Sequence, residues 1–201
     1  MDENIRIVTS ADIDGLKKVL DSCELFPSEY LDDMISDYLY NADSQDIWLT
    51  YMHDNKHAAF CYCVPEKLTD GTYNLLAIGV SQDYQRKGIA GELMKYIEQL
   101  LKRKDGRILI VETSSDIAQI SARKFYQKIG YNQEAVIRDF WKEGEDKVVF
   151  WKKLWLKLLL WLEWIDGTKL EFVAGWGDLF ASNISSYPAT ILKPLHLQPS
   201  F

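Results

Sequence analysis

The sequence predicts a mixed α/β domain in residues 1–154, with helices packed on a mainly antiparallel sheet, and a C-terminal extension in residues 155–201. Short apolar segments of strand character alternate with amphipathic segments of helical period. Between residues 73 and 112, a strand, a helix and a second strand with few charges follow one another, which is typical of a parallel crossover. The boundary rests on a change in composition, because Trp48 is the only one of the seven tryptophans before residue 141.

The first elements follow from local signals. Residues 5–8 are a short apolar strand, and Thr9 or Ser10 is placed to cap the next helix, whose apolar positions are Ile13, Leu16, Val19 and Leu20. Pro27 suits the first turn of a second helix, whose apolar side is formed by Leu31, Met34, Ile35, Tyr38 and Leu39. Residues 47–52 and 57–64 predict two strands joined by a turn at residues 53–56.

The second half of the domain continues the pattern. Residues 73–80 predict a strand, residues 88–104 an amphipathic helix and residues 107–112 a buried strand. Ser114 or Ser115 is expected to cap a further helix, which runs to Ile129 and ends at Gly130. Residues 131–138 and 147–154 predict two last strands, joined by a polar turn at residues 143–145.

Composition excludes several classes of protein. A chain with 47% hydrophobic residues is not disordered, and a net charge of −7 with a pI near 5.0 argues against a general nucleic-acid binder. Three cysteines without a CxxC spacing indicate neither a disulfide framework nor a metal site. The acidic first residues do not resemble a secretory signal, and no uncharged apolar run reaches the ~18 residues of a membrane span. We therefore expect a cytoplasmic globular protein.

The segment at residues 80–91 (VSQDYQRKGIAG) carries the most information about function, because it joins a buried strand to an amphipathic helix. Gly88 and Gly91 let the backbone approach a ligand closely. The free N–H groups of the new helix, together with Arg86 and Lys87, make an anion site suited to a pyrophosphate. Alone, the segment is equally compatible with an ordinary strand–turn–helix whose glycines serve tight packing.

Two motifs connect the chain to a known family. Gln85-x-x-Gly88-x-Ala90 resembles the Q/R-x-x-G-x-G/A acetyl-CoA motif of the GNAT N-acetyltransferase superfamily, and residues 122–131 (ARKFYQKIGY) are similar to its second signature. The resemblance covers residues 3–154. It implies a mixed sheet with one splayed parallel pair, helices on both faces, and acetyl-CoA as cosubstrate without a metal.

The resemblance also implies which residues hold acetyl-CoA. The backbone at Ile78, Gly79 and Val80 would bind the pantetheine arm, and a backbone N–H there, at Val80, would stabilise the oxyanion formed during acyl transfer. Gln119 corresponds to an asparagine that contacts the cofactor in many relatives. The loop and helix start would bind the pyrophosphate through Gln85, Arg86, Lys87, Gly88, Ile89, Ala90 and Gly91.

For catalysis, Tyr126 matches the family's general acid, which would stabilise or protonate the departing thiolate; outside the motif it would be a packing aromatic. Many relatives use a carboxylate on the strand before the phosphate loop as base, but Asn74 in the corresponding stretch cannot accept a proton. Glu112 is the first candidate for the base and Asp139 the second. Glu112 is equally compatible with a structural or capping role.

Other polar groups have weaker functional assignments. Five acidic side chains border the expected acceptor entrance and would attract a cationic amine, although a solvated helix face explains them better: Glu24, Glu29, Asp32, Asp33 and Asp37. His53 and His57 flank a turn, so both are expected to be exposed. Cys61 and Cys63 point to one face of a strand, as small core or site-lining residues.

The C-terminal extension has no counterpart in the family pattern. Residues 154–165 (LWLKLLLWLEWI) predict an apolar helix of about three turns, too short to span a bilayer. Packing on the sheet or on a second subunit, as in a homodimer, is favoured over peripheral contact with a membrane. From residue 167 onward we expect a loosely docked end.

Together these observations predict an N-acetyltransferase that moves the acetyl group of acetyl-CoA directly to a primary amine in a ternary complex. The expected acceptor is a small molecule or an amino-acid-like compound. Two alternatives remain open: a protein or peptide N-acetyltransferase, and an acyl-CoA-binding regulatory protein that has lost catalysis.

Overall fold

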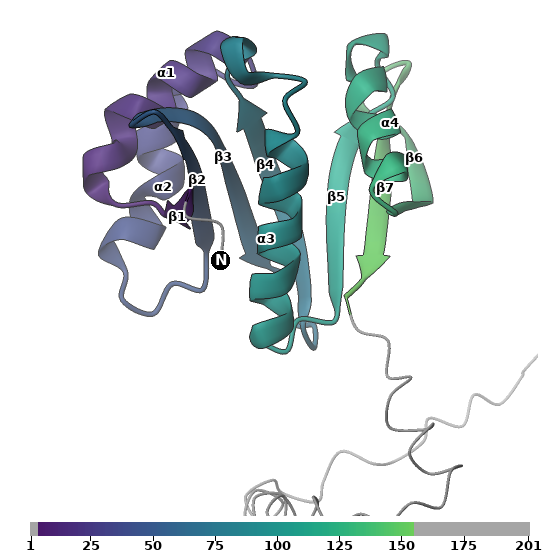
Figure 1. The fold of residues 1–201 in the computed structure, drawn as a ribbon. Coiled ribbons are helices and arrows are strands. Elements are labelled where there is room, and N and C mark those ends of the chain that lie inside the picture. The colour runs from purple at the N-terminus through teal and green to yellow at the C-terminus, as the bar shows by residue number, and fades with distance from the viewer. Residues whose placement is uncertain (1–3, 155–201) are drawn as a thin grey trace, which may run out of the picture. The chain divides into compact units, whose positions relative to one another are not determined.

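The computed structural model describes residues 4–154, which form one seven-stranded sheet with helices on both faces (Figure 1). The strands lie in the order β1-β2-β3-β4-β5-β7-β6, and only β4 and β5 are parallel. The predicted fold class is therefore confirmed. The strands are β1 (Ile5–Ile7), β2 (Ile47–His53), β3 (Lys56–Pro65), β4 (Thr72–Val80), β5 (Ile108–Ser114), β6 (Asn132–Lys142) and β7 (Glu145–Lys153).

Four α-helices pack on this part of the chain, each starting close to its predicted position. They are α1 (Ile13–Cys23), α2 (Leu31–Tyr40), α3 (Ile89–Arg103) and α4 (Ile120–Lys128). Short 3-10 turns precede them: η1 (Ser10–Asp12), η2 (Ser28–Tyr30), η3 (Gln82–Tyr84) and η4 (Ile117–Gln119). Thr9 is the N-cap residue of η1, in agreement with one of the two predicted alternatives.

The predicted cap of the helix after β5 is wrong. The N-cap residue is Asp116, whose Oδ1 accepts a hydrogen bond from the backbone N–H of Ala118 at 2.7 Å. Ser114 Oγ accepts from the backbone N–H of Asp116 at 2.9 Å, and Ser115 Oγ accepts from that of Asp146 at 2.8 Å. Both serines therefore stabilise the chain before the helix and its contact with the neighbouring strand. The Asp116 carboxylate satisfies a free N–H of the first turn.

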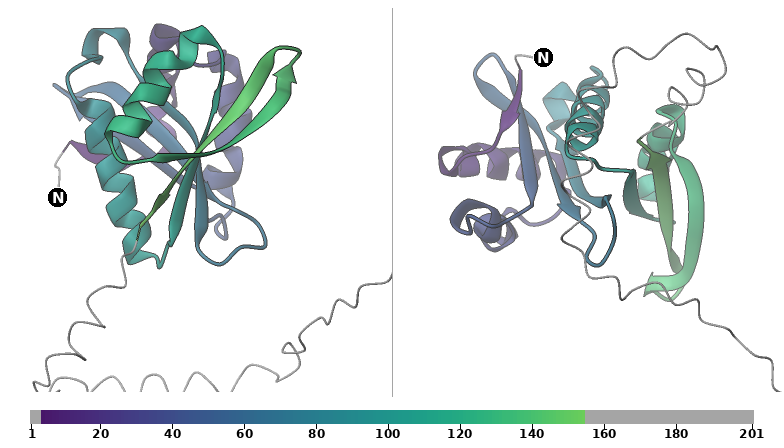
Figure 2. Two further views of the ribbon diagram at one scale, coloured as in Figure 1. Left: turned by 90° about the vertical axis from the view of Figure 1, so that its right-hand side faces the viewer. Right: turned by 90° about the horizontal axis from the view of Figure 1, so that it is seen from below.

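The two faces of the sheet bury different side chains, as strand alternation requires. On one face, α1 and α2 cover Trp48, Phe60 and Tyr62, and the Trp48 and Tyr62 rings stack with centroids 4.1 Å apart. On the other face, α3 and α4 cover the second core, which includes Cys61 and Cys63 as expected (Figure 2, left). Thus α1 and α3 enclose strands β3 and β4 from both sides, and α4 lies beside β5, β6 and β7 (Figure 1).

A bulge in β4 separates the two parallel strands. β4 pairs with β5 only from Thr72 to Leu75, opposite Ile108 to Val111. On its other side, Tyr62 pairs with Ala77 and Cys63 with Leu75, so Leu76 is an extra residue without a partner on β3. Beyond this point β4 and β5 diverge (Figure 1). The bulge therefore leaves a backbone edge of β4 facing an opening in the sheet.

Asp12 anchors the N-terminal strand to α1. Its buried carboxylate accepts hydrogen bonds from Arg6 at 2.6 and 2.7 Å, and from the N–H and hydroxyl of Thr9 at 2.7 and 2.9 Å. His57 Nε2 lies 3.4 Å from Asp12 Oδ1, and its Nδ1 is hydrogen-bonded to Thr50 at 3.0 Å. The hydrogen bonds to the Arg6 guanidinium hold the pKa of the Asp12 carboxyl well below its ordinary value.

The prediction that His57 is exposed is therefore wrong, whereas His53 is exposed as expected. His57 belongs to β3 and lies against α1, where Gly15 leaves room for its ring. A Cβ atom on Gly15 would be only 1.9 Å from His57 Cδ2. The His57 ring is thus buried because Gly15, on a helix far away in the sequence, has no side chain.

The strand at the sheet edge, β6, is exposed along its whole length. Its register with β7 shifts between Gln133 and Ala135, and again between Ile137 and Lys142, where Asp139 has a φ of 51°. Four large apolar side chains of this strand are about half exposed, namely Val136, Ile137, Phe140 and Trp141. The edge is therefore apolar but irregular.

Across residues 4–154, none of the helices has the length and apolar character needed to cross a bilayer. The extension at residues 155–201 lies outside the described residues, and with it the apolar helix expected at residues 154–165 beyond Leu154. The expected domain boundary, and the dimer or membrane contact of that helix, stay predictions.

We expect Asp12→Asn to lower the free energy of unfolding by ~2 kcal/mol at pH 7, because it removes the charge that three donor groups share. A folded-state pKa below the unfolded value stabilises the fold fully above the ordinary carboxyl pKa of ~3.9, and this contribution declines below that pH and is lost only as pH falls through the lower folded-state pKa. In urea unfolding, the difference between the two proteins should therefore be constant from pH 7 to about pH 5 and begin to narrow below a pH of ~4.

The matched control is Asp32→Asn, which breaks the exposed Lys17–Asp32 ion pair (2.7 Å) at a cost of about 1 kcal/mol or less. Equal losses in the two variants, or a loss in Asp12→Asn that does not change with pH, would contradict the assignment.

Candidate functional site

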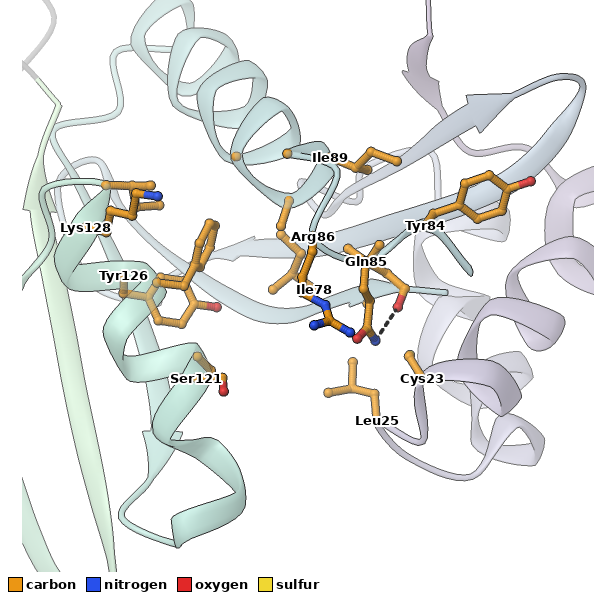
Figure 3. A pocket seen from close by; sticks show the side chains of 18 of the residues that line it. Cys23, Leu25, Ile78, Tyr84, Gln85, Arg86, Ile89, Ser121, Tyr126 and Lys128 are labelled. Atoms are coloured by element: carbon orange, nitrogen blue, oxygen red, sulfur yellow. Dashed lines mark hydrogen bonds between the residues drawn. The ribbon is translucent and has the colours of Figure 1, made fainter. Parts of the chain in front are cut away.

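A cavity of about 690 Å³ occupies the opening between β4 and β5 (Figure 3). The end of α1, the end of β4, the loop and first turn of α3, and one side of α4 form its walls. Its lining residues are Cys23, Leu25, Ile78, Gly79, Val80, Tyr84, Gln85, Arg86, Gly88, Ile89, Ala90, Gly91, Gln119, Ser121, Ala122, Phe125, Tyr126, Lys128 and Ile129. The predicted site residues are among them except Lys87 and the two candidate bases, Glu112 and Asp139.

The start of α3 presents free backbone donors to this cavity. Gly88 has a φ of 90° and Arg86 a φ of 60°, so the chain turns sharply into the helix. The Glu92 N–H bonds to the Gly88 carbonyl at 3.1 Å, and N–H groups earlier in the first turn have no acceptor within the helix. A Cβ atom on Gly91 would meet no atom within 4 Å, so the space beside the helix start is open. The helix dipole and these donors favour an anion here.

Side-chain hydrogen bonds hold the loop before α3 in place. Gln85 Nε2 donates to the carbonyl of Val80 at 3.1 Å, so this side chain closes the loop from its end to its start (Figure 3). The hydroxyl of Ser22, on α1, accepts from the Gln82 N–H at 3.0 Å and lies 3.0 Å from Ser81 Oγ. The anion site is thus fixed to both β4 and α1.

The positive charges around the cavity are not all those that the motif predicts. Arg86 lines the cavity, whereas Lys87 places its Nζ 5.0 Å from the centre of the Tyr84 ring and does not line it. Lys128, which sequence reasoning missed, supplies a second lining cation from α4. Helical spacing could have identified two other lining residues from the sequence, Ala122 and Ile129, because both share a face of α4 with Tyr126.

Tyr126 is buried in the wall, with only 4% of its surface exposed, and points its hydroxyl toward the cavity (Figure 3). Its ring contacts those of Phe125, Tyr131 and Phe150, with centroids 5.3, 5.8 and 5.8 Å apart. Burial raises the pKa of the Tyr126 hydroxyl above its ordinary value, so the phenol stays protonated at neutral pH. The side chain is therefore a proton donor held at a fixed place.

The candidate bases lie outside the cavity lining. Glu112 forms an ion pair with Lys147 at 2.9 Å on the sheet face opposite Val111. Asp139 accepts a hydrogen bond from the Gly144 N–H at 2.8 Å and so shapes the β6–β7 turn. Among the described residues that line the cavity none is acidic, which leaves Arg86 and Lys128 as its charged side chains.

Asn74, at the position where relatives carry a carboxylate, is buried and lies beside one. Its Nδ2 donates to Glu66 Oε1 at 2.9 Å, and its Oδ1 is a buried acceptor without a partner in the described part of the chain. Glu66 follows the end of β3, so the amide holds a carboxylate near the closed end of the opening. Within residues 4–154, His, Cys, Asp and Glu side chains form no group of three that could hold a metal ion.

The comparisons with known proteins agree with this geometry. The family described as "Acetyltransferase (GNAT) family" matches residues 15–131. No curated protein matches the sequence significantly. Among solved structures, a protein named as a GNAT-family acetyltransferase from Desulfovibrio desulfuricans is 23% identical with a TM-score of 0.71, over 75% of this chain and 98% of that one.

Two further structures have known acceptors in their names. The ribosomal-protein-S18-alanine N-acetyltransferase from Escherichia coli is 18% identical with a TM-score of 0.62, over 76% of this chain and 94% of that one. An aminoglycoside 6′-N-acetyltransferase complexed with coenzyme A is 14% identical with a TM-score of 0.62, over 76% of this chain and 98% of that one. At these identities the likeness shows the fold.

We expect Cys23 to report ligand binding in the cavity. All three cysteines are free thiols, but Cys61 and Cys63 are buried, and burial raises the pKa of the Cys61 thiol to about 12. Cys23 is half-buried and lines the cavity. Iodoacetamide at pH 8 should therefore label Cys23 alone, slowly because burial also raises its pKa, and coenzyme A should slow the labelling further.

Mass spectrometry of peptides locates the label, and Cys23→Ser is the control that should take up none. Labelling of Cys61 or Cys63 at the same rate, or labelling of Cys23 that coenzyme A leaves unchanged, would contradict the cavity as the coenzyme A site.

A pair of glycine variants separates ligand space from backbone strain. Gly91→Ala should leave stability unchanged or raise it by up to ~1 kcal/mol, because alanine favours a helix and meets no neighbour. It should weaken coenzyme A binding about tenfold by filling space beside the helix start. Gly88→Ala should cost about 1–2 kcal/mol of stability, because Gly88 has a φ of 90°. Thermal unfolding and calorimetric titration measure both quantities, and unchanged affinity in Gly91→Ala would contradict the placement.

Proposed function

Because the chain belongs to the acetyltransferase (GNAT) family, we propose that it transfers the acetyl group of acetyl-CoA directly to the primary amine of a small-molecule or amino-acid-like acceptor. One observation carries the proposal: a helix start with free N–H groups, two cations and a buried tyrosine hydroxyl surround a single cavity. These groups are the ones that binding a pyrophosphate and releasing a thiolate require.

The chain's own residues fit acetyl-CoA, which supplies an activated thioester. The N–H groups at the first turn of α3, with Arg86, would bind its pyrophosphate. Beyond Leu75, one edge of β4 has no strand partner on the β5 side, so backbone groups of residues 78–80 are available for the amides of the pantetheine arm. Lys128 would contact a further anionic group from the opposite wall.

Tyr126 would give a proton to the departing sulfur. A thiol resembling cysteine has a pKa of ~8.5, so its thiolate is a moderate leaving group that a nearby acid assists. The raised pKa of Tyr126 keeps this proton available over the whole neutral range. The backbone N–H of Val80 would stabilise negative charge on the thioester oxygen.

We propose Glu112 as the group that accepts the proton of the amine, with Asp139 as second candidate. Glu112 is the first residue of β5 beyond its last pair with β4, so it lies at the point where the opening begins. Its carboxylate is oriented by the ion pair with Lys147 at 2.9 Å. Proton transfer through a water would connect it to the cavity, which it does not line.

The acceptor class is part of the proposal. Exposed acidic side chains on α2 and the loop before it, including Asp33 and Asp37, favour a cationic amine. A protein or peptide amine is the second candidate, because the similar structures include one named for a ribosomal protein as well as one named for aminoglycosides. The three cysteines are free thiols, as in most cytoplasmic proteins, and the proposed location is the cytoplasm.

We expect Tyr126→Phe to lower kcat by about 10²-fold or more, because it removes the acid, and to change acetyl-CoA affinity by less than about twofold. Thiol release from acetyl-CoA would be followed with a panel of small amines, polyamines, aminoglycosides, amino acids and peptides. Tyr38→Phe is the matched control, since its hydroxyl donates to the Val8 carbonyl at 2.8 Å away from the cavity.

The outcomes separate the candidates. Release with one class of acceptor establishes the enzyme and its substrate type. Tight binding of acetyl-CoA without release for any acceptor would favour the regulatory protein that has lost catalysis. Absence of acetyl-CoA binding would overturn the proposal, and equal loss of binding and turnover in Tyr126→Phe would overturn the role of the acid.

A further inference from the structure

The carboxylate of Glu98 joins three elements at a partly buried point away from the ligand groups. Glu98 lies on α3, and its side chain is 12% exposed. Its Oε1 accepts a hydrogen bond from the Tyr131 hydroxyl at 3.0 Å, and its two oxygens accept from Lys152 Nζ, on β7, at 2.9 and 3.0 Å. Lys152 Nζ also donates to the carbonyl of Ile129, at the C-terminal end of α4, at 2.9 Å.

These bonds connect the two walls of the cavity. The first turn of α3 forms one wall and α4 forms the other, while the backbone pairing of β4 with β5 has already ended at Leu75. Glu98 is nine residues beyond Ile89, roughly 13 Å down the helix, so the bonds lie below the ligand groups. The distance between the walls therefore depends on side chains, and Glu98 on α3 is bonded to Tyr131, which follows α4.

Tyr131 carries this constraint to Tyr126. Gly130, with a φ of 86°, reverses the chain after α4, and the Tyr131 N–H then donates to the Tyr126 carbonyl at 3.0 Å. The two rings pack edge to face with centroids 5.8 Å apart, and Tyr131 is 2% exposed. Any shift of the Tyr131 hydroxyl therefore moves the ring that supports Tyr126.

The groups in this cluster are better suited to fixing the positions of their side chains than to adding stability to the fold. A buried ion pair contributes little net stability relative to apolar packing, but its geometry is restrictive when all its atoms are hydrogen-bonded. Here the carboxylate receives three bonds, and the ammonium donates to both the carboxylate and a helix-end carbonyl. Lys152 Nζ also lies 5.1 Å from the centre of the Tyr131 ring, which adds a cation–π contact.

We propose that Glu98, with Lys152 and Tyr131, is a positioning unit that holds the Tyr126 hydroxyl at its place in the cavity. This inference rests on the proposed function, because it assigns Tyr126 a task that depends on its exact placement. Glu98 and Lys152 lie outside both sequence motifs, Tyr131 is the last residue of the second, and none of the three lines the cavity.

The test is a double-mutant comparison in the full chain. Glu98→Gln removes the charge at nearly constant shape, and Tyr131→Phe removes only the hydroxyl. Each should lower kcat by about tenfold or more, since a displacement of ~1 Å can cost up to 10²-fold, and should leave KM for acetyl-CoA within about twofold. In a Tyr126→Phe background, neither substitution should lower kcat further, because the hydroxyl that they position is gone.

A matched control comes from a second, partly buried tyrosine–carboxylate pair in the described part of the chain. Tyr62 donates to Asp46 Oδ2 at 2.8 Å on the opposite side of the sheet, so Asp46→Asn breaks a similar bond without affecting Tyr126. Its kcat should equal that of the unmodified protein. If Glu98→Gln fails to fold, Tyr131→Phe, which retains the Glu98–Lys152 pair, carries the same comparison.

Fluorine NMR of protein labelled with 3-fluorotyrosine gives a readout that needs no acceptor. The Tyr126 signal, assigned by its loss in Tyr126→Phe, should shift or broaden in Glu98→Gln and Tyr131→Phe but not in Asp46→Asn. An unchanged signal, an unchanged kcat, or an equal loss of kcat in both backgrounds would overturn the positioning role. If Tyr126→Phe alone leaves kcat unchanged, the failure is that of the proposed acid instead.

Discussion

The interruption of backbone pairing at Leu76 is the constraint on which the rest of the molecule depends. A continuous parallel pair would satisfy every backbone group between β4 and β5 and leave no room for a ligand. The bulge ends that pairing at Leu75 and Val111, while both strands continue to Val80 and Ser114. Backbone groups that a neighbouring strand would have bonded therefore face a cavity, and the first turn of α3 meets them there. An opening inside a sheet thus becomes a cavity whose wall carries backbone donors and acceptors.

Opening the sheet transfers part of the structural task to side chains. Below the cavity, α3 packs Leu93, Ile97 and Leu101 into a core shared by strands on both sides of the opening. Apolar packing of this kind holds the elements together, but it fixes their relative orientation only weakly. Hydrogen-bonded charged side chains fix that orientation, Asp12 in the N-terminal part and Glu98 in the C-terminal part. Asp12 is the more buried of the two carboxylates, and they hold different halves of the molecule.

The sequence predicts most elements and the anion site because both depend on local spacing, and it fails where a side chain's direction depends on distant partners. Arg86 and Lys87 are equivalent in the motif, but the left-handed backbone at Arg86 directs one toward the cavity and the other toward Tyr84. Glu112 lies within β5, which continues to Ser114 instead of ending at residue 112, and its pairing with Lys147, 35 residues away in the chain, leaves no local signal. The buried position of His57 has the same cause. Local spacing therefore predicts which residues line the cavity more readily than it predicts how a distant carboxylate is paired.

The irregular pairing of β6 has a consequence for how molecules of this protein meet one another. An incoming strand needs an uninterrupted row of N–H and C=O groups in register, and two shifts within β6 break that row. Val136 and Ile137 can thus stay exposed at a sheet edge without offering a template for fibre growth. At high protein concentration, side chains would make the contacts between molecules at this edge. Such contacts are reversible and depend on the shapes of the side chains. The bulges allow an apolar margin and colloidal stability to coexist in one strand.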